Sequence, residues 1–243
     1  MILGRAMRHI TILTGAGISA ESGVPTFRDA NGLWHNHKIE DVASYDGYVR
    51  NPSLVQSFYN ARRRALLDPA VQPNAAHFAL AKLQREFKGK VCLVTQNVDN
   101  LHERAGSANV LHMHGELFKV HCKNTQQVYK WEGDIDIEKD RCACCDEVGT
   151  LRPHIVWFGE MPLHMDDIAA EMVETDLFVS IGTSGVVYPA AGFVREARQY
   201  GALTLELNLE CSDATAFNTS LQGKATELVP KWVDSVLDGS FTI

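Results

Sequence analysis

Residues 9–28 read HITILTGAGISAESGVPTFR, in which a short β-rich run leads directly into a glycine turn and a stretch of small residues. A strand followed by such a turn is typical of the first unit of a dinucleotide-binding fold. Gly15, Ala16 and Gly17 begin a match to G-x-G-x-x-A, whose glycines let the backbone approach a pyrophosphate at a helix N-terminus. A plain tight turn would give the same letters, and no clear acidic residue closes the second strand to hold a ribose.

The rest of the chain alternates between two kinds of periodicity. Continuous apolar runs predict strands, and amphipathic runs of helical spacing predict helices. We expect strands over 9–13, 90–95, 110–113, 155–158, 177–181 and 202–208, and helices over 53–67, 74–87, 165–174, 190–200 and 229–237. This alternation predicts the α/β class, with a Rossmann-like parallel sheet flanked by helices.

Two stretches interrupt the alternation and predict a discontinuous domain. Residues 31–70 carry an amphipathic helical run, and residues 119–149 hold four cysteines among acidic residues. We therefore expect a small inserted domain, made of a helical part over 31–70 and a zinc-ribbon-like part over 119–149. The dinucleotide-binding domain would then consist of 1–30, 71–118 and 150–243.

The composition is that of an ordinary globular protein. Charged residues make up 22% of the 243, and a net charge of −7 argues against a basic surface for nucleic acid. Residues 1–9 lack the apolar core of a secretory signal, and the apolar stretch 177–193 is interrupted by Ser, Thr, Gly and Pro. We therefore expect a cytoplasmic monomer that contacts neither nucleic acid nor membrane directly.

Polar side chains follow the strand expected over 90–95. Residues 95–102 read TQNVDNLH, and the carboxyl ends of parallel strands are where α/β folds place ligands. Asn97 is suited to bind a carboxamide or orient a water, and Asp99 is suited to accept from an amide N–H. These residues by themselves fit a loop cap equally well.

Two histidines alternate in the stretch His112-Met113-His114-Gly115. On a strand both rings would point to one face. The glycine after His114 predicts a turn and an exposed imidazole suited to general-base chemistry near neutral pH. A histidine pair also suits a metal, although no third ligand stands beside it.

These stretches resemble the sirtuins, the NAD-dependent protein-lysine deacylases, and in particular the bacterial class III (CobB-type) members. The matching stretches keep the family's order over nearly the whole chain and are 15–19, 25–28, 95–99, 114–115, 156–160, 182–184 and 208–210. The resemblance implies that NAD is consumed as a co-substrate. It also implies that acylated-lysine proteins are the substrates, bound in the cleft between the domains.

The resemblance further implies an NAD site. The residues that it assigns to the cofactor are Gly15, Ala16, Gly17, Ser19, Phe27, Arg28, Trp34, Gln96, Asn97, Asp99, Gly182, Thr183, Ser184, Asn208, Leu209, Glu210 and Ala225. Gln96, Asn97 and Asp99 would line the nicotinamide pocket, while Asn208 and Glu210 would meet the adenosine half. A ribose contact from this later strand end accounts for the missing acidic residue after the second strand.

In the implied reaction, the acyl oxygen of the substrate lysine attacks C1′ of the nicotinamide ribose as nicotinamide leaves. His114 is the implied general base, which deprotonates a ribose hydroxyl. The products are free lysine, nicotinamide and 2′-O-acyl-ADP-ribose. The backbone of Val156, Trp157, Phe158 and Gly159 would pair with an extended substrate peptide, although a buried sheet strand would look similar.

Tyr59 and Arg62 bear on the acyl group. They stand at i and i+3 of one expected helix and share a face. In the resembling class this pair recognises acidic acyl groups such as succinyl or malonyl, since a guanidinium can bind a carboxylate bidentately. Without the resemblance, Arg62 reads as one of three solvated arginines. Acetyl-lysine would also be accepted, because a long pocket does not exclude a short group.

The cysteines depart from the family's pattern. The usual two Cys-x-x-Cys pairs would hold a structural zinc, but the first pair is Cys122 and Thr125 here. We expect zinc on Cys122, Cys142 and Cys145, with Cys144 or an outside group as the fourth ligand. A metal-free, vestigial module is the alternative.

Two other functions use the same residues. Mono-ADP-ribosyl transfer would draw on the same NAD chemistry, and the Tyr59 and Arg62 pair argues against it by pointing to acyl recognition. A catalytically silent NAD-sensing module would have no need of His114, Asn97 and Asp99 together. A hydride-transfer dehydrogenase fits less well, since the family consumes NAD.

Overall fold

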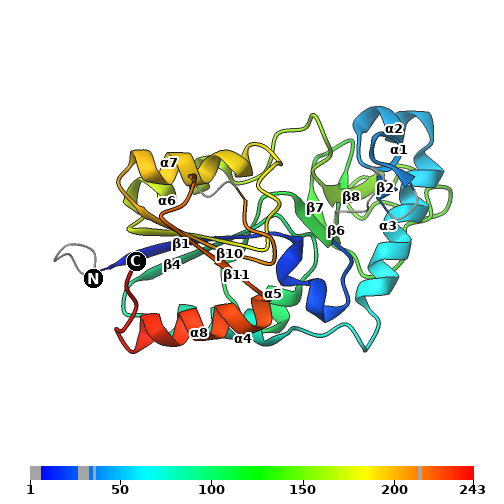
Figure 1. Ribbon diagram of the computed structural model, residues 1–243. Coiled ribbons are helices and arrows are strands. Elements are labelled where there is room, and N and C mark those ends of the chain that lie inside the picture. Colours follow the sequence, from blue (N-terminus) through cyan, green and yellow to red (C-terminus); the bar gives the residue numbers. More distant parts are fainter. Residues whose placement is uncertain (1–6, 27–32, 35–36, 213–214) are drawn as a thin grey trace.

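A six-stranded parallel sheet is the centre of the computed structural model, which describes residues 7–26, 33–34, 37–212 and 215–243 (Figure 1). Its strands are β1 (His9–Thr14), β4 (Lys90–Thr95), β5 (Leu111–His112), β9 (Leu177–Ile181), β10 (Leu203–Asn208) and β11 (Thr219–Gln222). Their order is β11-β10-β9-β1-β4-β5, and the neighbours pair in parallel. The order reverses between β1 and β9, and ligands of such sheets bind outside the carboxyl ends at this switch point.

Helices cover both faces of the sheet. One face carries α4 (Ala75–Glu86) and α8 (Ala225–Leu237), and the other carries α6 (Met165–Glu174) and α7 (Phe193–Gln199) (Figure 1). Strand β1 is buried throughout: Ile10 and Ile12 pack in the core with Leu80 of α4, whereas Leu13 packs with Ile168 of α6. The two-residue alternation of a strand thus divides one apolar run between two cores.

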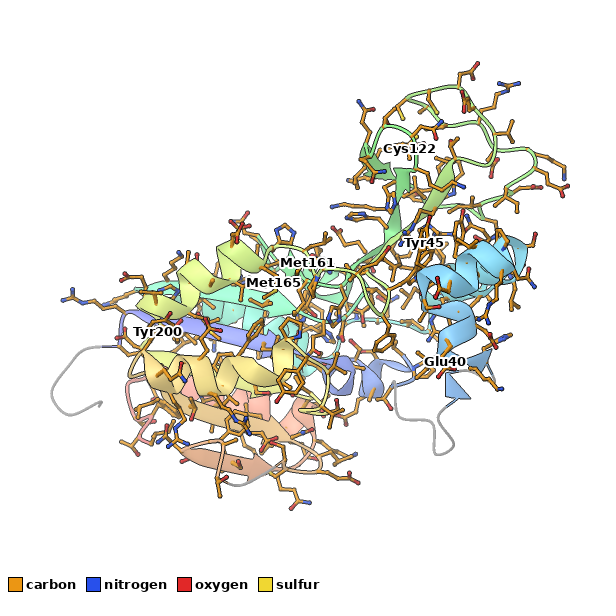
Figure 2. All side chains as sticks on the ribbon, turned by 90° about the horizontal axis from the view of Figure 1, so that it is seen from above. Glu40, Tyr45, Cys122, Met161, Met165 and Tyr200 are labelled. Atoms are coloured by element: carbon orange, nitrogen blue, oxygen red, sulfur yellow. The ribbon has the colours of Figure 1, made fainter. Side chains whose placement is uncertain are left out.

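A smaller part extends beyond the carboxyl ends of the sheet (Figure 1). It contains the antiparallel strands β6 (Gly115–Cys122), β7 (Val128–Lys130) and β8 (Leu151–Ile155), in the order β7-β6-β8, and the helices α1 (Ile39–Val42), α2 (Tyr45–Arg50) and α3 (Pro52–Leu66). Tyr59 and Val55 of α3 pack with Leu117 and Trp157 in a core of their own. Cys122 lies at the far end of this part, remote from the sheet helices (Figure 2).

Short elements complete the described chain. They are β2 (Leu33–Trp34), β3 (His37–Lys38), α5 (Leu101–Arg104) and the 3₁₀ turns η1 (Ala16–Ile18), η2 (Ala20–Ser22) and η3 (Ala190–Gly192). Among the helices of the described ranges, we find none with the length and apolar character needed to cross a membrane.

The α/β class and the Rossmann-like parallel sheet are confirmed, but two boundaries are wrong. Only Ile155 of the strand expected over 155–158 lies in a strand, because the chain then leaves β8 and Phe158 N–H donates to Ala43 O at 2.9 Å. The helix expected from residue 229 begins at Ala225. Proline is rare inside a helix, and Pro230 lies within this one, so its first turn was not predicted from the sequence.

Candidate functional site

The glycine loop after β1 lies against the loop after β9. Gly17 N–H donates to Gly182 O at 2.9 Å, and Gly15 N–H donates to Ile181 O at 3.0 Å. A Cβ on Gly17 would lie 2.7 Å from the Gly182 Cα, and one on Gly15 would lie 2.8 Å from the Gly182 carbonyl oxygen. The glycines are therefore required where two chain segments meet at the switch point.

The segment after the glycine loop forms the two short 3₁₀ turns η1 and η2. Gly23, with φ +84, ends η2 in the left-handed region, and Pro25 follows two residues later. A left-handed residue followed by proline cannot continue a helix.

Ser19 joins the glycine loop to the segment after β4. Its hydroxyl donates to Asp99 Oδ2 at 3.0 Å and accepts from Asn97 Nδ2 at 3.2 Å. The Asn97 amide also donates to Gly15 O at 3.2 Å, and Leu101 N–H donates to Asp99 Oδ1 at 3.1 Å. Burial raises the pKa of Asp99 while these donors lower it. The residues expected at the nicotinamide end are therefore one buried hydrogen-bonded cluster, and not a simple loop cap.

His114 lies in the turn between β5 and β6, so it does not share a strand face with His112, contrary to expectation. Its Nδ1 lies 3.2 Å from Gln96 O and must carry the proton, because a carbonyl can only accept. This leaves Nε2 as the free acceptor of the neutral ring. The side chain is half-buried where we expected it to be exposed, and burial lowers its pKa.

The residues assigned to the diphosphate and adenosine follow β9 and β10. Asn208 Nδ2 donates to Thr183 O at 2.7 Å, which joins the two strand ends. Gln96 and Thr183 line a cavity of about 110 Å³ on the α7 side. Ser184 follows β9, Leu209 and Glu210 are exposed after β10, and Ala225 begins α8.

Sequence reasoning missed Glu206. This buried residue of β10 accepts from Ser212 N–H at 2.9 Å and from Ser220 Oγ at 3.0 Å, and so fixes the segment after β10. A single carboxylate in the otherwise apolar strand LTLELN was the signal that could have found it, because a buried charge requires partners.

The pair Tyr59 and Arg62 is divided between two environments. Tyr59 is fully buried, and its hydroxyl accepts from Trp157 Nε1 at 2.9 Å. Arg62 is half-buried with its guanidinium 4.6 Å from the centre of the Phe58 ring. Arg62 and His37 line a cavity of about 300 Å³ along α3, and Tyr59 is not among its lining residues. Arg62 is thus not fully solvated.

The backbone N–H groups of the segment after β8 are hydrogen-bonded within the protein. Val156 N–H donates to His114 O at 2.9 Å, and Trp157 N–H donates to Glu160 Oε2 at 2.8 Å. Phe158 N–H is likewise taken by Ala43 O. Phe158 is 51% exposed, whereas Trp157 is buried. A peptide laid along this segment would therefore meet its carbonyl groups and Gly159.

Four cysteines converge at the tip of the smaller part. The Sγ atoms of Cys122, Cys142, Cys144 and Cys145 all lie within 4.8 Å of one another. Tetrahedral zinc, with bonds of about 2.3 Å, separates its sulfur ligands by about 3.8 Å, so this donor set fits a structural zinc. Thr125 Oγ1 lies 2.9 Å from Cys144 Sγ, and Cys144 supplies the sulfur that Thr125 lacks. Cys144 therefore lies close enough to the other three sulfurs to serve as the fourth ligand that the sequence left open.

Three of the residues assigned to NAD cannot be placed. Phe27 and Arg28 lie outside the described residues, as does the side chain of Trp34, whose backbone belongs to β2.

Comparison with known proteins matches this arrangement to one family. A model of the Sir2 family matches residues 15–189. NAD-dependent protein deacylase SIR2rp3 of Leishmania major is 66% identical over 97% of this chain and 98% of its own length. An NAD-dependent protein deacylase of Salmonella typhimurium is 56% identical over 95% of this chain and 85% of its own.

Solved structures agree with the sequence relatives. A Sir2 homologue in complex with NAD superposes with a TM-score of 0.86 at 39% identity, covering 96% of this chain and 91% of that one. Sir2Af2 bound to a myristoylated histone peptide has a TM-score of 0.73 at 33% identity, covering 97% and 94%. The chain belongs to the Sir2 family.

Proposed function

We propose that this protein removes acyl groups from protein lysines and consumes NAD, releasing nicotinamide and 2′-O-acyl-ADP-ribose. The observation that carries the proposal is the cluster at the switch point of a Sir2-family chain, where Asn97 and Asp99 are hydrogen-bonded to Gly15 and Ser19, and His114 lies against the neighbouring Gln96 carbonyl. Its relatives at 56% and 66% identity are named NAD-dependent protein deacylases. In this proposal the nicotinamide end of NAD lies at Asn97 and Asp99, and the adenosine end lies at Asn208 and Glu210.

His114 would act as the general base. Its Nδ1–H is held by Gln96 O, so Nε2 is available to take a proton from a ribose hydroxyl. Because burial lowers its pKa, the ring is neutral at pH 7 and able to accept. The deprotonated hydroxyl attacks the imidate left after the acyl oxygen has displaced nicotinamide.

Arg62 and Tyr59 would favour acidic acyl groups such as succinyl. The Tyr59 hydroxyl accepts from Trp157 Nε1 at 2.9 Å, which fixes the position of the phenol on α3. Burial raises the pKa of Tyr59, and the hydrogen bond from Trp157 and the positive charge of Arg62 act in the opposite direction. Acetyl-lysine would enter the same pocket without the ionic contact.

The four cysteines would hold a structural zinc. Four thiolates complete a tetrahedral shell, so the metal would stabilise the fold and leave no open position for chemistry. We also infer two domains with substrate bound between them, and the separate cores of the six-stranded sheet and of α3 with β6 support this division. The expected bounds 71–118 and 150–243 differ from these cores, because Leu117 and Trp157 pack with α3 of the smaller part.

An assay of matched peptides tests the activity and the acyl preference. The protein is incubated with NAD and with acetyl- or succinyl-lysine peptides of one sequence, and products are followed by mass. We expect both peptides to lose their acyl group, and we expect Arg62→Met to reduce kcat/KM for succinyl by about tenfold or more while leaving acetyl within about threefold. Arg64→Met, two residues further along α3, is the matched control.

Two results would contradict the proposal separately. Loss of acyl from neither peptide excludes the deacylase activity, and labelled ADP-ribose on protein would favour mono-ADP-ribosyl transfer instead. Equal succinyl turnover by the wild type and Arg62→Met would exclude carboxylate recognition alone.

A further inference from the structure

His112 is a buried histidine that the proposed reaction does not use. It ends β5, and its Nδ1 lies 3.1 Å from Asn97 O. Its Nε2 lies 2.7 Å from Glu103 Oε1, and the Glu103 side chain is 42% exposed. The ring therefore spans from a surface carboxylate to the backbone of the pocket segment.

Both ring nitrogens of His112 face acceptors. A carbonyl oxygen accepts only, so Nδ1 carries a proton. An ionised carboxylate also accepts only, and it is far less basic than imidazole, so Nε2 carries the second proton. The ring is thus an imidazolium, and the contact with Glu103 is a charge-assisted hydrogen bond.

The charged groups around His112 favour this state. Glu103 on α5 and Glu116 on β6 raise its pKa against burial, which lowers it, and the net direction is upward. On the pocket side, the positive ring lowers the pKa of Asp99. Its other neighbour, His102, has a pKa held well below its ordinary value by burial and is neutral.

The His112 ring also holds Asn97 in place, because it binds the backbone carbonyl of that residue. His112 and His114 hold the consecutive carbonyls of Asn97 and Gln96, so one short segment of chain fixes two peptide groups of the pocket. A neutral His112 could keep one of its two contacts as a donor but not both. Loss of its second proton would therefore release either the Glu103 carboxylate or the Asn97 carbonyl.

We propose that His112 is a positioning residue for NAD binding: held as an imidazolium by Glu103, it fixes the Asn97 carbonyl and supports the negative charge of Asp99. The proposal rests on the proposed function only in placing the nicotinamide end of NAD at Asn97 and Asp99. It predicts that NAD affinity falls as pH rises through the raised pKa of His112.

Calorimetric titration with NAD over about pH 6 to about pH 9 tests this. In the wild type, affinity should fall by about fivefold through one transition in the upper part of this range. Glu103→Gln keeps the size of the side chain and removes its charge, so the transition should move to lower pH by about one unit or more. Glu174→Gln, an exposed residue at the end of α6 with the same change of charge, should keep the wild-type midpoint.

His112→Asn supplies the second variant. Its amide can donate to Asn97 O but cannot titrate, so the upper transition should vanish, while any transition from His114, whose pKa is lowered, stays below that of His112. Identical midpoints in the wild type and Glu103→Gln would overturn the proposal. A uniform loss of affinity at every pH would do so too, since it indicates structural damage alone. If NAD binding follows the predicted pH profiles but no peptide is deacylated, the positioning role of His112 is supported and the proposed activity is contradicted.

Discussion

At the scale of single residues, two imidazoles that face neighbouring carbonyls differ in chemistry because the rest of their surroundings differ. His112 and His114 are two positions apart, and each directs Nδ1 to a neighbouring carbonyl. The second nitrogen of His112 meets a carboxylate, whereas burial dominates at His114 and lowers its pKa. The contacts therefore favour the charged ring at His112 and the neutral ring at His114.

The pH dependence of catalysis should report His114. A base is competent only when unprotonated, and a lowered pKa means that protonation occurs only at lower pH. We expect kcat/KM for the acyl peptide, measured at saturating NAD, to fall as pH falls through a pKa below 6.5. His114→Ala should reduce kcat by about 100-fold or more and remove this acid limb. An acid limb at or above pH 6.5 in the wild type would contradict the assignment.

At the scale of elements, α3 joins the cavity lined by Arg62 to the cysteine-bearing segment. The fully buried Arg63 donates Nε to Leu117 O at 2.9 Å and Nη1 to Gly133 O at 3.0 Å. Asn60, one turn earlier, exchanges two hydrogen bonds with the backbone of Ile135, at 2.9 and 3.0 Å. The basic run of α3 is thus partly internal, contrary to a reading of three solvated arginines.

Arg63→Met should test this attachment. It keeps the stem but leaves the buried Leu117 carbonyl and the part-buried Gly133 carbonyl without their donor, so we expect a loss of about 2–4 kcal/mol in the free energy of unfolding. The neighbouring Arg64 is exposed and pairs with Asp134, so Arg64→Met should cost less than about 1 kcal/mol. Urea unfolding measures both, and equal losses would show that α3 is not attached through Arg63.

At the scale of the whole molecule, two cores of different origin meet at the carboxyl ends of one sheet. The sheet is stabilised by apolar strands and helices on both faces, whereas the far end of the smaller part contains few buried apolar residues around its cysteines. Cys122 lies at that far end (Figure 2), so a metal there would replace a core that the segment is too small to build.

Metal content should follow the cysteine cluster. We expect about one zinc per chain in the purified protein and less than about a tenth of that in Cys142→Ser. Cys211→Ser removes an exposed thiol outside the cluster and should leave the zinc unchanged. The measurement is elemental analysis, and a wild-type content below about a tenth of an equivalent would refute the zinc site.

Local patterns were sufficient for the sheet and for the residue types of the site. Strands β4 and β9 and helix α6 have the boundaries that the apolar runs predicted, because their burial is set by their own periodicity. The strand expected over 155–158 was wrong because apolar residues such as Trp157 are buried there without sheet pairing. Strand β11, over Thr219–Gln222, was missed because its polar edge position gives no apolar run.

The sequence by itself determined the family, the parallel sheet and the residues that gather at its carboxyl ends, because strand direction alone brings those ends together. Only the tertiary structure decided which contacts those residues make. It placed Gly17 against Gly182, brought Cys144 beside the other three cysteines of the cluster, and set His112 between a carbonyl and a carboxylate. These partners lie far apart in sequence or in different elements, so no local spacing encodes their distance, their burial or their protonation.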